Sequence, residues 1–118
     1  KQINVGDRIW QPTYTDDLAY NSLILLSENK NGIYNMASHG QTSFYDLTVK
    51  IASLLEIEDK ISIRKIPSSH FSKKENAHRP NIAVIENTRL KQESLDLQRK
   101  WDESLKEYLS HSYFRDLF

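Results

Sequence analysis

The stretch "DRIWQPTYTDDLAYNSLILL", residues 7–26, places a loop with a Pro-Thr pair directly before a segment with helical character. Thr15 is one of the residue types whose side chain caps helix N-termini. Asp16 and Asp17 follow it, where the positive end of the helix dipole favours negative charge. We therefore predict a helix that starts with Thr15 as its N-cap. Its spacing puts Ala19, Leu23 and Leu26 on a core-facing stripe.

A second helix is predicted after residue 43. Ser43 and Asp46 form a near capping box, with Asp in place of the usual Glu. Apolar residues then recur at helical spacing, and these are Leu47, Ile51, Leu54 and Leu55. Phe44 and Tyr45, at the start of this helix, are expected to join the core.

The other segments complete a mixed pattern of short elements. Strands are predicted at 2–5, 33–36, 60–66 and 81–85, helical segments at 87–90 and 101–109, and irregular chain at 68–78. Trp101 begins the apolar stripe of the last helix and is expected in the core. The fold class is therefore α/β or α+β, a small mixed lobe with about three helices and short strands.

Composition narrows the classes of partner. The 118 residues suffice for one domain, and 16 basic side chains balance 16 acidic ones. A nucleic-acid or anionic-membrane binder would carry a basic excess, so neither partner is expected. No apolar run approaches the ~20 residues of a membrane span. The chain has no cysteine, which excludes a thiolate metal site and fits a reducing, cytoplasmic location.

Three stretches together resemble one enzyme family. They are "PTYTDDLA" (12–19), "GIYNMASHGQTSFYDLTVKIA" (32–52), and "RPNIAVIENTRL" with "WDESLKEYL" (79–90 and 101–109). In order and spacing they resemble the C-terminal part of extended short-chain dehydrogenase/reductases, in particular dTDP-4-dehydrorhamnose reductases and their relatives. The resemblance extends over nearly the whole chain.

The resemblance implies that residues 1–118 are the lobe that binds the nucleotide-sugar substrate of an NADP-dependent enzyme reducing a 4-keto-deoxysugar nucleotide. Family members bind NADP(H) on a Rossmann domain with a glycine-rich loop and a Tyr-x-x-x-Lys pair. This chain has three glycines, far apart, and no Tyr with Lys four residues on. We therefore expect no cofactor site and no catalytic residue in it, and a Rossmann domain as its partner.

One motif departs from the family pattern. The family usually reads Asp-Gln-x-Gly-x-Pro-Thr at the opening loop, whereas here Arg8 replaces Gln and Trp10 replaces Gly. The identity of the substrate's sugar is therefore left open, as is the choice between a reductase and an epimerase. A non-catalytic regulatory or interaction module of the same fold is the alternative function. An unrelated small α/β interaction domain is a third reading.

Four residues are candidate substrate ligands. Arg79 precedes Pro80, which restricts Arg79 to extended conformations. An extended arginine can donate two parallel hydrogen bonds to a diphosphate. The alternative is that Arg79 forms a salt bridge or stacks on an aromatic ring. Trp10 could stack on a ring of the ligand and Gln11 could hydrogen-bond it, unless Trp10 packs on the lobe or on the absent domain. Thr13 is the fourth candidate, with a turn role as its alternative. The four histidines lack a metal-ligand spacing, so no metal site is expected.

Overall fold

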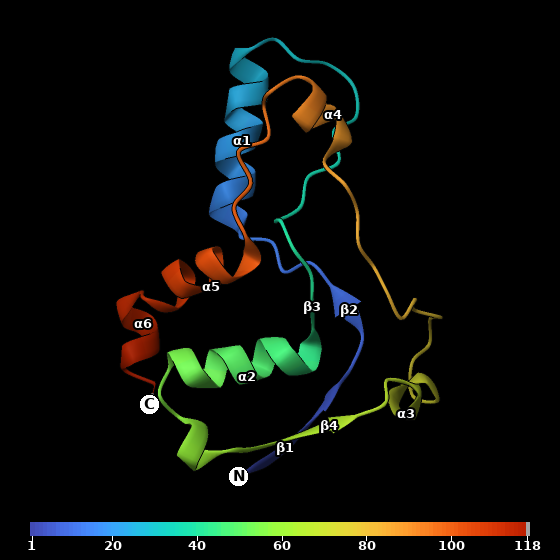
Figure 1. The fold of residues 1–118 in the computed structure, drawn as a ribbon, viewed down its shortest axis with the longest axis vertical. Helices are drawn as coiled ribbons and strands as arrows, with labels where there is room; N and C mark the ends of the chain where they lie inside the picture. Colours follow the sequence, from blue (N-terminus) through green and yellow to red (C-terminus); the bar gives the residue numbers. More distant parts are fainter. Residues whose placement is uncertain (118) are drawn as a thin grey trace.

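The computed structural model describes residues 1–117 as an elongated lobe with extents of 50 × 37 × 21 Å. The long helix α1 (Thr15–Ser27) and the short helix α4 (Thr88–Gln92) stand at one end of it (Figure 1). The helix α2 (Phe44–Leu54) and the strands β1 and β4 lie at the other end, near both termini. The predicted class, a small mixed lobe with three main helices and short strands, is confirmed.

Two of the predicted strands, 2–5 and 60–66, pair to form one parallel two-stranded ribbon. β1 (Gln2–Gly6) pairs with β4 (Ser62–Ile66), with Ile3 opposite Ile63. Parallel strands need a long crossover, which here contains α1 and α2. α2 packs along this ribbon, and a 3-10 turn (Glu58–Lys60) leads from α2 into β4 (Figure 1).

The start of α2 has the predicted cap. The Ser43 hydroxyl accepts a hydrogen bond from the Asp46 amide at 2.9 Å and donates to the Asp46 carboxylate at 2.7 Å. The predicted apolar stripe of α2 is half-buried along its length, and Ala52 is fully buried within it. Two strands that the sequence did not predict, β2 (Ile9–Trp10) and β3 (Thr42–Ser43), pair antiparallel just before this helix.

Two predictions for α1 are wrong. Thr15 is the first helical residue, and the N-cap position belongs to Tyr14, whose side chain makes no capping bond. The predicted core stripe is exposed, with Leu23 at 63% and Leu26 at 70%. The helix packs instead through the opposite face, centred on the fully buried Asn21. Apolar residues occupy both faces of α1, so periodicity alone could not decide between them.

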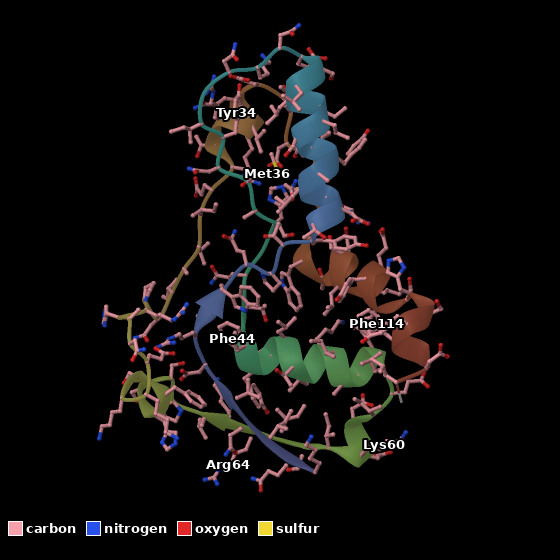
Figure 2. The ribbon with its side chains drawn as sticks, turned by 180° about the vertical axis from the view of Figure 1, so that it is seen from behind. Tyr34, Met36, Phe44, Lys60, Arg64 and Phe114 are labelled. Carbon is pink, nitrogen blue, oxygen red and sulfur yellow. The ribbon has the colours of Figure 1, made fainter. Side chains whose placement is uncertain are left out.

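Two predicted strands are absent from the described structure. Residues 33–36 are extended but form no strand, and Ile33 is 85% exposed. Among residues 81–85 only Ile82 forms a bridge, to Ile9. A β-prone segment becomes a strand only where another backbone edge lies beside it, and 33–36 has none within the described residues. In Figure 2, the side chain of Met36 points from the 33–36 segment toward α1.

The second half of the chain adds short helices. The 68–78 segment contains a one-turn helix, α3 (Ser69–Ser72), in otherwise irregular chain. The predicted helices at 87–90 and 101–109 are confirmed as α4 and α5 (Trp101–Leu109), and α6 (Ser112–Arg115) follows. Trp101 is half-buried rather than fully enclosed. No helix within residues 1–117 is long and apolar enough to cross a membrane.

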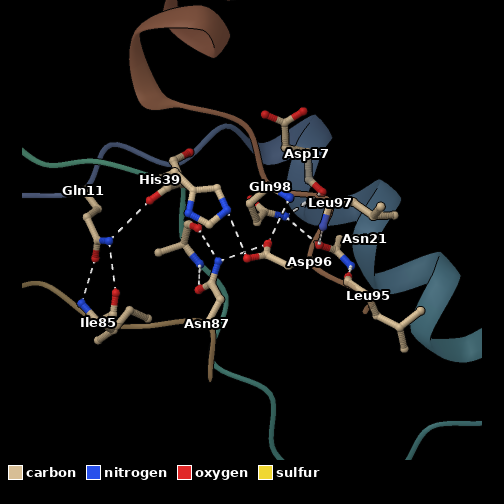
Figure 3. A network of polar contacts seen from close by, with 12 residues as sticks. Gln11, Asp17, Asn21, His39, Ile85, Asn87, Leu95, Asp96, Leu97 and Gln98 are labelled. Carbon is tan, nitrogen blue, oxygen red and sulfur yellow. Dashed lines mark hydrogen bonds and ion pairs between the residues drawn. The ribbon is translucent and has the colours of Figure 1, made fainter. Parts of the chain in front are cut away.

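Side-chain amides join the irregular segments to the rest of the lobe (Figure 3). Asn87 donates to the Ala37 carbonyl at 2.7 Å and accepts from the Ala37 amide at 2.9 Å. Gln11 binds both backbone groups of Ile85, at 3.1 and 2.8 Å. Asn21 donates to the carbonyl of one residue of the α4–α5 connection and accepts from the amide of another, at 2.9 and 3.1 Å. We call Gln11, Asn21 and Asn87 the amide clips.

The two adjacent leucines of α1 test the helix phase. Leu25→Ala is expected to lower the free energy of unfolding by about 1–3 kcal/mol, because Leu25 is half-buried. Leu26→Ala should change it by less than about 0.5 kcal/mol, because that side chain is mostly in solvent. Urea unfolding of both variants makes the measurement. A larger loss for Leu26→Ala would restore the phase that the sequence predicted.

The clips should matter more than exposed amides of the same kind. Asn87→Ala is expected to cost about 2–3 kcal/mol, because it leaves the buried backbone groups of Ala37 without partners. The control is Asn35→Ala, an exposed position, with an expected change below about 0.5 kcal/mol. Equal losses in urea unfolding would show that the Asn87 clip contributes nothing specific.

Candidate functional site

Trp10 and Phe44 form a stacked aromatic pair. The pairing of β2 with β3 brings Trp10 opposite Thr42, so its indole meets the first residue of α2. The ring centroids lie 4.8 Å apart with an interplanar angle of 16°. Phe44 is 41% exposed, so it is not the core residue that the sequence predicted. The pair offers flat apolar surface at the border of a cleft.

A cleft of about 560 Å³ opens beside this pair and contains two of the four predicted ligands. Trp10 and Phe44 line one side, Arg8 and Glu75 another, and Arg79 and Pro80 line it from the loop that follows. We call it the arginine cleft. Arg79 is exposed and makes no ion pair within residues 1–117, so its guanidinium is available to an anion.

Arg8 and Glu75 are joined by a two-pronged ion pair in the same cleft. The two Nη atoms of Arg8 donate to the two carboxylate oxygens of Glu75 at 2.7 and 2.8 Å. The side chains are only 15% and 25% exposed. The bonds from Arg8 hold the pKa of the Glu75 carboxyl below its ordinary value, and the charge of Arg79 acts in the same direction.

Gln11 and Thr13 lie outside the arginine cleft and have internal partners. The amide of Gln11 is engaged by Ile85 and by the Ser38 carbonyl at 3.3 Å. The Thr13 hydroxyl donates to the Gln11 carbonyl and accepts from the Ser38 amide, each at 3.1 Å. Both residues border a neighbouring cleft of about 440 Å³ that Trp10 also reaches. A ligand contact for either residue stays a prediction.

Asp7 binds Ser68, one of the residues that line the arginine cleft. Its Oδ1 accepts from the Ser68 hydroxyl at 2.8 Å and from the Ser68 amide at 2.9 Å, and its own amide donates to the Ser68 hydroxyl at 3.1 Å. These bonds tie the end of β1 to the turn after β4. The side-chain bond from Ser68 is the main cause of a lowered pKa for the Asp7 carboxyl.

Two further clefts lie beside α2, and the predicted ligands Trp10 and Thr13 border one of them. One, of about 340 Å³, lies between α2 and α5, where Ile51, Trp101 and Tyr108 make an apolar wall. The other, of about 520 Å³, lies between the end of α2 and α5–α6, beside Leu109 and Phe114. Tyr14 and Trp10 border only the first of these, so it adjoins the aromatic pair rather than the arginine pair.

Sequence reasoning missed Glu75 and Phe44 as members of the site. Each lies more than 30 residues from its partner, Arg8 or Trp10, and the pairings depend on β2–β3 and on the path of the chain after β4. Arg8 and Trp10 themselves depart from the family motif, and these departures were the available signal.

The glycines serve the packing of this lobe and do not form a dinucleotide loop. A Cβ on Gly40 would meet the Trp101 ring at 3.2 Å, and one on Gly6 would meet the Ser68 hydroxyl at 3.1 Å. Gly32 has φ +100° and lies against the Arg89 guanidinium. No glycine therefore stands at a turn from a strand into a helix, where a pyrophosphate would bind. Within residues 1–117 no group of three metal-ligating side chains occurs.

Comparison with known proteins defines the class of this domain. A family model described as the RmlD substrate binding domain matches residues 2–114, and the chain belongs to that family. The resemblance inferred from the three motifs is thereby confirmed.

Relatives place this domain within longer proteins. The chain is 30% identical over 105 residues to the spore coat polysaccharide biosynthesis protein SpsK of Bacillus subtilis, covering 89% of this chain and 35% of that protein. It is 32% identical to a dTDP-4-dehydrorhamnose reductase of Clostridium acetobutylicum, with a TM-score of 0.84 over 92% of this chain and 38% of that one. A reductase of Bacillus anthracis, solved in complex with NADP, has the same fold at 22% identity and a TM-score of 0.84. The chain thus spans little more than a third of these relatives.

The Asp7–Ser68 contact predicts an acid-labile contribution to stability. The folded chain keeps Asp7 ionised to lower pH than the unfolded chain does, so the contact stabilises above about pH 4 and this stability is lost as the pH falls through the lowered pKa. Asp7→Asn should therefore reduce stability at pH 6 and flatten its decline toward pH 3. The measurement is the urea midpoint across this range. Asp59→Asn, at an exposed position, is the control. If the urea midpoint of Asp7→Asn falls toward pH 3 as steeply as that of Asp59→Asn, the prediction is wrong.

Proposed function

We propose that this chain is the nucleotide-sugar-binding lobe of an NADP-dependent enzyme that reduces a 4-keto-deoxysugar nucleotide, as its relative from C. acetobutylicum is named for doing with a dTDP-sugar. Residues 1–118 are the substrate-binding lobe, and a Rossmann domain outside them binds NADP(H). The lobe contributes orientation, which matters when substrate and hydride donor must be aligned. Its own residues hold the substrate and carry out no chemical step.

One observation supports this function above the others: Arg79, which makes no ion pair among the described residues, lines the same cleft as the Trp10–Phe44 stack. A nucleotide sugar combines a diphosphate with flat or apolar rings. A guanidinium can bind two phosphate oxygens through parallel hydrogen bonds. The exposed faces of an aromatic pair suit a base or the C–H face of a sugar. Gln11 and Thr13 then shape the wall beyond Trp10, where the ligand extends from the cleft.

The exposed side of α1 supports a Rossmann domain as partner. Tyr20, Leu23 and Leu26 are 59–70% exposed on the face opposite the packed one. A helix that is apolar on both faces is ordinarily buried on both. Residues 33–36 make no backbone–backbone hydrogen bond within the described chain, although the Ile33 carbonyl accepts one from the Arg89 side chain at 3.3 Å. We propose that this helix face and this segment pack against the cofactor-binding domain, where 33–36 completes a sheet.

Arg79 is the residue that tests the proposed function. In the 118-residue chain, Arg79→Ala should weaken binding of thymidine diphosphate by about 1.5–3 kcal/mol, the worth of a hydrogen bond to a charged group. Arg79→Lys should restore only part of the affinity, because an ammonium cannot fork across two phosphate oxygens. Calorimetric titration and the melting temperature are measured on the same samples.

Arg64→Ala is the matched control, since Arg64 is also exposed but lies on β4, away from the cleft (Figure 2). It should leave thymidine diphosphate binding unchanged. If Arg79→Ala lowers only the melting temperature while affinity per folded molecule holds, Arg79 is a structural residue and the proposed site is wrong.

A further inference from the structure

The loop that carries Arg79 has no structure of its own. Residues 76–80 are all exposed, and no backbone hydrogen bond joins any of them to another part of the described chain. An arginine on such a loop loses much side-chain and backbone freedom when it binds a ligand, which weakens binding. Something outside the loop must restrict it if Arg79 is to be held at the cleft.

Both ends of this loop are held by two adjacent residues, Arg8 and Ile9. At one end, Arg8 grips Glu75 with the two bonds at 2.7 and 2.8 Å. At the other end, the Ile9 amide donates to the Asn81 carbonyl and the Ile9 carbonyl accepts from the Ala83 amide, both at 2.9 Å. The chain from 75 to 81 is therefore a short closed loop, pinned to one point of the opening segment.

The Nη donors of Arg8 are used in the contact with Glu75, so Arg8 itself does not bind the ligand. Both of its Nη atoms bind Glu75, and its Nε is buried without a hydrogen-bond partner. A glutamine, the usual family residue at this position, could not form the two-pronged contact. The pin at Glu75 is thus a feature of this chain that follows from Arg8.

We propose that Arg8 and Glu75 are positioning residues that hold the Arg79 loop at the cleft and thereby set its affinity for the diphosphate of a nucleotide ligand. The proposal rests on the proposed function of the cleft. Glu75 acts through the loop and does not touch the ligand. Its two effects on ligand affinity oppose each other. Holding the loop favours binding of the diphosphate, whereas the negative charge of a carboxylate beside the cleft repels an anion.

This opposition makes Glu75→Gln the decisive variant. Electrostatics alone predicts that removing the negative charge tightens thymidine diphosphate binding. Positioning predicts that releasing the loop weakens it by about 2- to 10-fold, the cost of ordering a mobile side chain on binding. Arg8→Gln should weaken binding similarly, and Arg8→Lys should recover part. Glu86→Gln, an exposed position without an ion pair among the described residues, should leave affinity unchanged.

A double variant shows whether Glu75 acts through Arg79. In an Arg79→Ala background, Glu75→Gln should cause no further weakening, because the residue being positioned is gone. Amide hydrogen exchange gives a readout without ligand: the hydrogen-bonded amides of residues 75 and 83, at the two ends of the loop, should exchange faster in Glu75→Gln than in the unaltered chain, while α2 exchanges at the same rate. Unchanged exchange in α2 also shows that the variant is folded.

The outcomes separate the two proposals. If Arg79→Ala leaves thymidine diphosphate binding unchanged, or the unaltered chain does not bind it, the proposed function fails and the positioning role fails with it. If Arg79→Ala weakens binding while Glu75→Gln tightens it or leaves it unchanged, only the positioning role is wrong. Weakening by both, with no additional effect in the double variant, supports both.

Discussion

Side-chain amides that pair with distant backbone hold this lobe together. An Asn or Gln side chain carries one carbonyl and one N–H₂ group, so it can satisfy a backbone amide and carbonyl as a neighbouring strand would. Asn87 does this for Ala37, Gln11 for Ile85, and Asn21 for the α4–α5 connection. The segments that they hold are extended but lack strand partners in the described chain. Without the clips, the two ends of the lobe would be joined mainly by irregular chain.

The buried residues reflect this arrangement. Among the described residues, five apolar side chains are buried and two of them are alanines, whereas eight polar ones are buried, including two of the clips and Gln98. Gln98 donates to the Asn21 side chain at 3.2 Å, and Asp96 accepts from the Gln98 amide and lies 3.0 Å from the His39 ring (Figure 3). A connected set of this kind stabilises only when its members are satisfied, so it specifies one arrangement of the loops more strictly than apolar contact would. That precision matters here because the opening loop carries Gln11 between the aromatic pair and the first helix.

The arginine cleft depends on the same opening loop. Asp7 binds Ser68, Arg8 binds Glu75, Ile9 bridges to Ile82, and Trp10 stacks on Phe44. Four consecutive residues thus each attach a different part of the lobe. Two of them, Arg8 and Trp10, depart from the usual family motif, and both departures line the cleft. The differences from the family are therefore concentrated at the place where the ligand is proposed to bind.

The sequence by itself determined the elements whose signals are local: the Ser43 cap, the α2 stripe, the β1 and β4 segments, and the last helix. It also carried the three motifs that identify the family, because a motif is a property of residue order. Only the tertiary structure decided which face of α1 is packed, because apolar residues line both faces and the choice depends on what Asn21 meets. It likewise decided that 33–36 stays unpaired, since a strand needs a neighbouring edge that no local pattern reveals. The partners of Arg8 and Trp10 were beyond sequence reasoning for the same reason: Glu75 and Phe44 reach them through the path of the whole chain.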